Sequence, residues 1–128
     1  MTAGQGRGGN SRIRLGRQGE ELAVGHLIAE GYRIVERNWR CPSGELDVVA
    51  EDDGVIVFVE VRSRRDTGTF GSPEESIDAR KQKKVRETAG YYLYRNRLLG
   101  AKARFDVVTV IFTPAGSFLK LNHLKQAF

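Results

Sequence analysis

Residues 45–62 read Glu-Leu-Asp-Val-Val-Ala-Glu-Asp-Asp-Gly-Val-Ile-Val-Phe-Val-Glu-Val-Arg, and this run predicts a β-hairpin. Asp53-Gly54 between two apolar runs is typical of a two-residue type I′ turn, because both central positions need a positive φ. Counting outward from this turn sets Asp47 directly opposite Glu60. Two like charges in this position destabilise a sheet, so we expect a positive charge to lie between them.

Side chains alternate between the two faces of a strand, so the hairpin should have an apolar face and an acidic face. The predicted apolar face carries Leu46, Val48, Ala50, Val57, Val59 and Val61. The opposite face carries Glu45, Asp47, Val49, Phe58, Glu60 and Arg62. Because the second strand is apolar at nearly every position, we expect it in the middle of the sheet, where Glu60 would be half sheltered.

The chain has 128 residues, of which 40% are hydrophobic, enough for one domain with its own core. No apolar run approaches the length of a transmembrane helix, so we expect no membrane partner. Residues 1–11 are rich in glycine and predict a disordered tail, which leaves 12–128 as a single domain. The one cysteine, Cys41, cannot form an intramolecular disulfide, in keeping with a reducing cytoplasm. The net charge of +5 favours an anionic partner.

The remaining sequence predicts two helices and three further strands. The helices span about 12–30, followed by Gly31 as a C-cap, and from a capping box at 72–75 to about Arg97, with a break near Asp78. The strands span 33–40, 104–112 and 118–124, the last of them at an edge. A crossover helix permits parallel pairing of the strands that it joins. The order α-β-β-β-α-β-β therefore predicts an α/β fold around a mixed sheet.

Asp47, Glu60 and Arg62 share one predicted face and indicate a metal site. Magnesium prefers oxygen ligands and is usually held by one or two carboxylates together with waters and a substrate phosphate. Hydrolysis of a phosphodiester is the chemistry that such a set serves best. The alternative is that Glu45 and Glu60 merely pair with Arg62 on a solvated face, since surface ion pairs are common. Both interpretations stay open at this point.

Glu20 falls inside the apolar stripe of the first predicted helix, beside Ile13, whereas Glu21 points away from it. A carboxylate on the buried side needs a partner, because charged residues are rarely buried alone. Metal coordination is one open explanation, and a capping or salt-bridge role with Arg17 or a neighbouring strand is the other. Gly16 and Gly19 would let another element approach this helix closely.

A cluster of cations at the start of the second helix predicts a rim that binds phosphate, since helix N-termini also favour anions. Its members are Arg80, Lys81, Lys83, Lys84 and Arg86, joined by Arg62, Arg64 and Arg65 from the end of the hairpin. The alternative is an ordinary solvated helix face. His26 and His123 lack the spacing of a zinc site and are interpreted as surface or core-edge residues. For Asp106 the sequence gives no physical reason to join the site.

Five motifs taken together resemble the YraN-like family of bacterial predicted endonucleases, over about residues 16–110. They are Gly16-x-x-Gly19-Glu20-x-x-Ala23, Asn38-x-Arg40, Gly44-Glu45-Leu46-Asp47, Val57-Phe58-Val59-Glu60-Val61-Arg62 and Arg104-Phe105-Asp106-Val107. That family is similar to archaeal Holliday junction resolvases of the restriction-endonuclease-like PD-(D/E)XK superfamily. The resemblance implies a restriction-endonuclease-like core in 12–128, with a mixed sheet flanked by helices.

The resemblance also implies roles for four residues. Glu20, Asp47 and Glu60 would be the ligands of Mg²⁺ or Mn²⁺, and Arg62 would be the catalytic cation. The family usually has lysine at this last position. Arginine stays protonated, so it can hold a phosphate or orient water but cannot act as a general base.

The sequence therefore predicts a magnesium-dependent endonuclease of DNA, with branched or damaged DNA as candidate substrates. The residues expected to position the DNA backbone are Arg40, Arg62, Arg64, Arg65, Lys81, Lys83 and Lys84. Two alternatives remain: a nucleic-acid-binding protein that keeps the nuclease fold without turnover, and an interaction partner of DNA-repair proteins. Junction-cleaving relatives act as dimers, so a homodimer is also left open.

Overall fold

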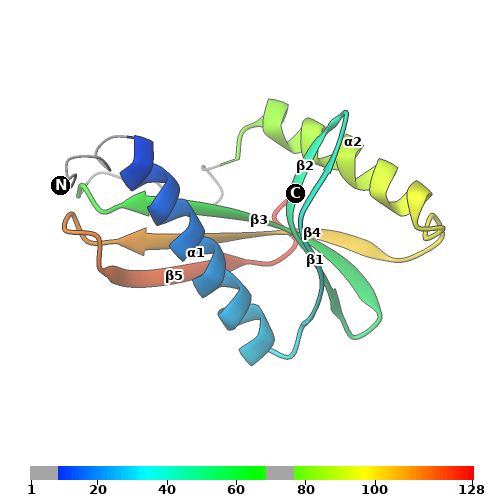
Figure 1. The fold of residues 1–128 in the computed structure, drawn as a ribbon. Helices are drawn as coiled ribbons and strands as arrows, with labels where there is room; N and C mark the ends of the chain where they lie inside the picture. Colours follow the sequence, from blue (N-terminus) through cyan, green and yellow to red (C-terminus); the bar gives the residue numbers. More distant parts are fainter. Residues whose placement is uncertain (1–8, 69–76) are drawn as a thin grey trace.

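A five-stranded sheet with one helix packed on each face forms the architecture of the computed structural model, which describes residues 9–68 and 77–128 (Figure 1). The elements are α1 (Gly9–Ala29), β1 (Arg33–Cys41), β2 (Gly44–Asp52), β3 (Val55–Arg65), α2 (Ala79–Arg95), β4 (Ala103–Phe112) and β5 (Phe118–Leu124). Strands follow one another across the sheet in sequence order. Among the strands of the described residues, only β3 and β4, which α2 connects, pair in parallel. The predicted element order, the mixed sheet and the α/β class are confirmed.

The predicted hairpin is present with its predicted register. Asp53 and Gly54 both have positive φ, 53° and 85°, and Asp52 pairs with Val55. Pairing of β2 with β3 ends at Val48 and Val59, one residue before Asp47 and Glu60. These two acids therefore lie just beyond the last paired residues, where the two strands separate.

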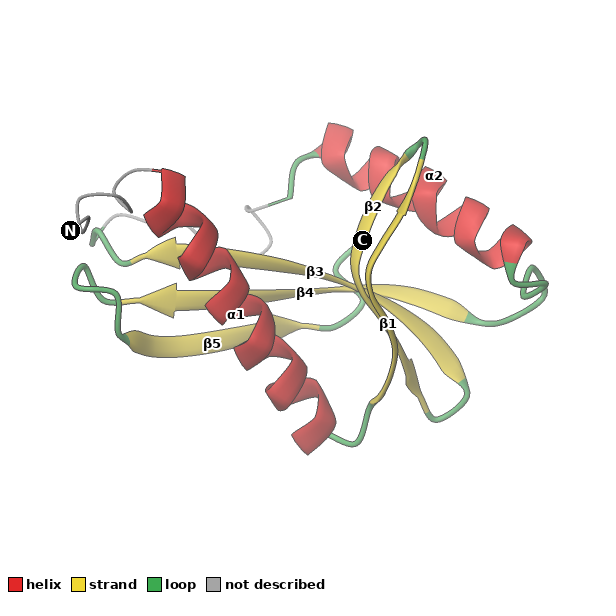
Figure 2. Ribbon diagram, in the orientation of Figure 1, coloured by secondary structure: helices red, strands yellow, loops and turns green. Residues whose placement is uncertain are grey.

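Beyond Val48, β2 continues only with β1, as a two-stranded ribbon that extends toward α2 (Figure 2). Two-stranded ribbons twist more strongly than the interior of a sheet. As a result Leu46 packs with Val49 and Phe58 against α2 rather than beside Val48. The prediction that Leu46 shares the face of Val48 is wrong for this reason.

Each helix buries its own apolar cluster against one face of the sheet. The α1 cluster contains Leu15, Ala23, Val24, Leu27, Tyr32, Val48, Ala50, Val57, Val59, Val108, Val110 and Phe112. The α2 cluster contains Leu46, Val49, Phe58, Val85, Ala89 and Tyr92. Because β3 is covered on both faces, the side chain of Glu60 is only 4% exposed, more buried than predicted.

Helix α1 begins at Gly9, three residues before its predicted start, while residues 1–8 of the predicted tail lie outside the described residues. Ile13 is 56% exposed, so its place in the buried stripe is wrong, and Leu15 is buried instead. A Cβ at Gly19 would overlap the Ser63 hydroxyl, which confirms a close approach there. At Gly16 a Cβ would meet no atom within 4 Å, so the prediction that another element approaches the helix closely at Gly16 is wrong.

Helix α2 begins directly after Asp78, whose carboxylate accepts a hydrogen bond from the backbone N–H of Lys81. The break predicted near Asp78 is thus the N-cap of the helix. The predicted capping box at 72–75 lies outside the described residues. In the parts of the chain that the structure describes, neither helix has the length and apolarity needed to cross a bilayer.

Candidate active site

Asp47 and Glu60 form an acid pair where β2 and β3 separate. Burial and, to a smaller extent, the negative charge of Asp47 raise the pKa of Glu60 to about 7, against the opposing effect of Lys81. Burial also raises the pKa of Asp47, although its carboxylate accepts a hydrogen bond of 2.9 Å from the Val61 backbone N–H. Two neighbouring carboxylates that both resist ionisation create a demand for positive charge at this point.

The cation closest to the pair comes from α2. Lys81 Nζ lies 3.5 Å from Glu60 Oε1, so Lys81 supplies the positive charge that the hairpin register led us to expect. Arg62 is exposed and lowers the pKa of Glu60 more weakly than Lys81 does. The alternative in which Arg62 pairs with Glu45 and Glu60 is not observed: Glu45 lies 3.7 Å from Arg40 instead.

Glu20 reaches the same region from α1, with its side chain 20% exposed. Its carboxylate accepts a hydrogen bond of 3.1 Å from Asn38 and lies 3.7 Å from the guanidinium of Arg37. Glu20 and Asp47 line the same hollow, and the negative charge of Glu20 contributes to raising the pKa of Asp47. Glu21 is mostly exposed, as predicted, and its carboxylate lies 2.8 Å from the guanidinium of Arg37.

Two hollows meet at Asp47. The first, here called the α1 hollow, has a volume of about 610 Å³ and lies between α1 and strands β1 to β3. The second, the α2 hollow, has a volume of about 510 Å³ and lies between the β1–β2 ribbon and α2. Asp47 and Arg40 line both of them. Asp47 is therefore the member of the acid pair that is accessible from both depressions, whereas Glu60 lines neither.

The two carboxylates of Asp47 and Glu60 are donors that fit a hard divalent cation. Among residues 9–68 and 77–128, no group of three or more acidic, histidine or cysteine side chains is arranged to hold a metal ion. Glu20 is engaged by Asn38 and Arg37, and would have to turn from them to join Asp47 and Glu60. One or two carboxylates are the usual protein share of a magnesium site, so the raised pKa values of this pair fit such an ion.

The predicted backbone-binding cations separate into groups. Arg40 and Arg62 line the α1 hollow, and Lys81 and Lys84 line the α2 hollow with Arg40. Lys83 faces a third depression at the start of α2, which it shares with Arg80, Lys81 and Lys84. Arg64 and Arg65 line neither the α1 nor the α2 hollow, and Arg65 contacts Ser11 at 3.3 Å.

Arg12 and Arg17 line the α1 hollow as well, although neither was predicted to bind the DNA backbone. Glu20 pairs with Arg37 and Asn38, so the predicted salt bridge to Arg17 is not observed. A signal for Arg12 was present in the sequence, because Arg12, Gly16 and Glu20 follow one another at i, i+4 spacing and so share one helix face.

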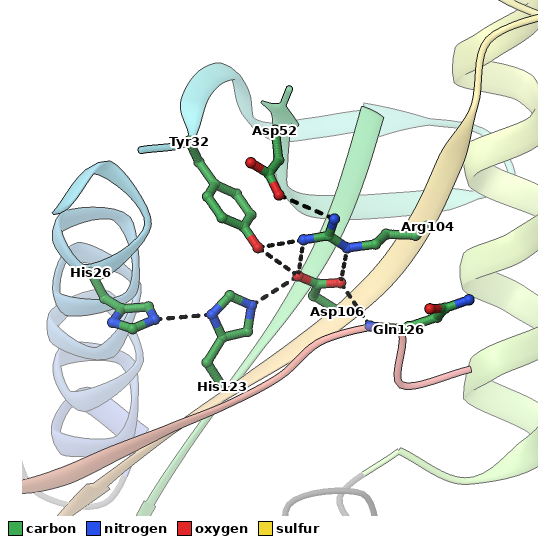
Figure 3. Close-up of polar contacts among 7 residues, drawn as sticks. All are labelled: His26, Tyr32, Asp52, Arg104, Asp106, His123 and Gln126. Atoms are coloured by element: carbon green, nitrogen blue, oxygen red, sulfur yellow. Dashed lines mark hydrogen bonds and ion pairs between the residues drawn. The ribbon is translucent and has the colours of Figure 1, made fainter. Parts of the chain in front are cut away.

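A polar network on the α1 side of the sheet was also missed (Figure 3). Asp106 is fully buried and accepts hydrogen bonds from Arg104 Nε at 3.0 Å, the Gln126 backbone N–H at 3.0 Å and Tyr32 Oη at 3.3 Å. His123 Nε2 lies 2.8 Å from the same carboxylate. Burial works to raise the pKa of Asp106, but the hydrogen bonds from His123 and Arg104 outweigh it and lower the pKa to about 2.

This network connects elements that are far apart in the sequence. His26 of α1 makes a hydrogen bond of 2.9 Å to His123 of β5 (Figure 3). Arg104 also contacts Tyr32, and its guanidinium lies 3.2 Å from Asp52 at the hairpin turn. The interpretation of the two histidines as separate surface or core-edge residues is therefore incomplete, since they hold α1 to the sheet.

The fold and the site together define an α/β protein with an acid pair, half-buried Asp47 and buried Glu60, beside two cation-lined hollows. The chain belongs to the family described as "Uncharacterised protein family UPF0102", whose model matches residues 19–110. It is 51% identical to a UPF0102 protein of Moorella thermoacetica over 118 residues, covering 92% of this chain and 98% of the relative. It is 45% identical to one of Persephonella marina over 113 residues, covering 88% and 91%.

The family assignment confirms the YraN-like resemblance, while the relation to junction resolvases stays a prediction. Among solved structures, the chain is similar to "The structure of Pyrococcus Furiosus SfsA in complex with Ca2+", with a TM-score of 0.43 and 16% identity. The match covers 90% of this chain but only 64% of the SfsA chain. A likeness of this size carries no conclusion about the site.

Proposed function

We propose that this protein is a magnesium-dependent endonuclease that hydrolyses phosphodiester bonds of DNA in the cytoplasm. The observation that carries the proposal is the acid pair of half-buried Asp47 and buried Glu60, whose pKa values are both raised, together with the two cation-lined hollows that share Asp47. Strong perturbation of neighbouring acids beside a surface depression is typical of a functional site, because active sites use burial and like-charge pairs to shift the pKa values of their acids.

In this proposal one group of residues binds the metal ion and another residue binds the phosphate. Asp47 and Glu60 would hold the metal, with Glu20 available from α1 once it leaves Asn38. When bound, magnesium supplies Lewis-acid activation of water and stabilises the negative charge that develops at phosphorus. Arg62 would hold the phosphate under attack, since a guanidinium binds phosphate oxygens with two parallel hydrogen bonds.

The surrounding cations support a nucleic acid as the substrate. Lys81 contacts Glu60 from α2, Lys84 lines the α2 hollow with Asp47, and Arg40 lines both hollows. Contacts of this kind bind the sugar-phosphate backbone and carry no information about base sequence. The proposal therefore expects discrimination by DNA structure, with branched or damaged DNA as the candidates.

The direct test is cleavage of nicked, flapped and four-way junction DNA in the presence of Mg²⁺ or Mn²⁺. The proposal predicts cutting by the wild-type protein, loss of cutting in EDTA, and loss in Asp47→Asn and Glu60→Gln. Glu87→Gln, an exposed carboxylate on α2, serves as the matched control and should leave cleavage unchanged. Equal cutting by the Asp47 variant and the wild type would exclude this site.

A second candidate function is DNA binding without turnover. The contact of Lys81 with Glu60 favours it, because a cation from the protein itself already neutralises part of the acid pair. Arginine in place of lysine at position 62 points in the same direction. Salt-sensitive binding of DNA without cleavage, and without restoration of cleavage in Arg62→Lys, would support this alternative over the first.

A further inference from the structure

The two hollows are neighbours at Asp47. Arg40 and Asp47 line both of them, so a ligand that lies over these two residues can reach into either hollow. A nucleic-acid strand carries one negative charge for about every 3.4 Å of helix axis. A strand with one phosphate at Asp47 therefore has further phosphates on both sides of it, and each side needs cations.

The α1 side of this path has cations to which no role has been given. Arg12 and Arg17 extend from α1 into the α1 hollow, and both are exposed. Neither has an ion-pair partner among the described residues. The acid on the same wall, Glu20, is engaged by Asn38 and by Arg37, which does not line the hollow. The positive charge of this wall is thus left to attract an anion.

The wall that α1 contributes to the hollow, which includes Arg12, Gly16 and Arg17, also leaves room for a ligand to approach the helix closely. Gly16 lies between the two arginines and lines the hollow, and a Cβ at this position would meet no heavy atom within 4 Å. The helix backbone is therefore accessible there, in contrast to Gly19, which is covered by Ser63. An extended ligand can lie against this face without displacing any part of the sheet.

We propose that the substrate strand crosses Asp47 with phosphates in both hollows, so that Arg12 and Arg17 bind the phosphodiester backbone on the side away from α2. This inference rests on the proposed function, because it takes DNA as the ligand. It adds a second binding wall to the rim that the sequence places at the start of α2. The competing arrangement is a strand confined to α2 and the α2 hollow.

The salt dependence of DNA binding separates the two arrangements. The affinity for a four-way DNA junction is measured in EDTA over a series of salt concentrations, for the wild type, Arg12→Gln, Arg17→Gln and Arg14→Gln. Arg14 is the matched control, because it is exposed on the same helix but does not line the hollow. Glutamine has nearly the helix propensity of arginine, and helical circular dichroism checks that each variant folds.

The proposal predicts that Arg12→Gln and Arg17→Gln each reduce the slope of log K against log salt by about 1, while Arg14→Gln leaves it unchanged. If the wild type binds DNA and all three variants share its slope, the strand does not contact α1. The inference then fails while the proposed function stands. If the wild type binds no DNA at any salt concentration, the proposed function fails and this inference with it.

Discussion

Replacing Glu60 by glutamine should stabilise the protein at alkaline pH. The pKa of Glu60 is about 7 in the folded chain and 4.5 as its ordinary value, so folding favours the protonated form. Below pH 4.5 the carboxyl is neutral in both states and costs nothing. Between pH 4.5 and about 7 the unfolded chain ionises Glu60 while the folded chain keeps it protonated, so stability is lost over this range and levels off above it. At 1.36 kcal/mol per pH unit, this loss reaches about 3 kcal/mol.

Glutamine has the shape of the protonated carboxyl and cannot ionise, so Glu60→Gln should recover this free energy. The assay is urea unfolding in EDTA at pH 4 and pH 8, with Glu87→Gln as an exposed control on α2. We expect Glu60→Gln to raise the free energy of unfolding by up to about 3 kcal/mol at pH 8 and to change it little at pH 4. A variant no more stable than the wild type at pH 8 would refute the reasoning.

Two further changes test the packing around the site. Asp106→Asn should lower the free energy of unfolding at pH 7 by at least about 2 kcal/mol. The reason is that ionised Asp106 stabilises the fold above its ordinary pKa of 3.8, and this contribution disappears as the pH falls through about 2. Equal urea midpoints of the variant and the wild type at pH 7 would contradict this prediction. Gly19→Ala should cost about 1–3 kcal/mol because of the overlap with Ser63, whereas Gly16→Ala should stabilise α1 by about 0.5–1 kcal/mol. Thermal melting compares the two alanine variants, and a reversed order would count against the packing described.

The central hairpin could be predicted because its determinants are local. Asp53 and Gly54 specify the turn, and the turn specifies the register as far as Val48. The position of Leu46 could not be derived in this way. It depends on the point where β2 leaves β3 and follows the more strongly twisted ribbon, which is set by packing against α2.

The acidic residues of the site were predicted more readily than the side chains that contact them. The register brought Asp47 and Glu60 to one place, and the required cation followed from electrostatics. That this cation is Lys81 depends on how α2 packs across the sheet. The hydrogen bond between His26 and His123 joins residues 97 positions apart, and no spacing rule links them. Long-range polar contacts of this kind require the fold to be known first.

Calorimetric titration with Mn²⁺ tests the acid pair most directly, because it requires no knowledge of the DNA substrate. We predict that the wild-type protein binds the ion with a saturable heat, that Asp47→Asn and Glu60→Gln abolish this heat, and that Glu87→Gln retains it. A wild-type protein that gives no binding heat with Mn²⁺ or Mg²⁺, or variants that bind as the wild type does, would contradict the assignment of Asp47 and Glu60 as metal ligands.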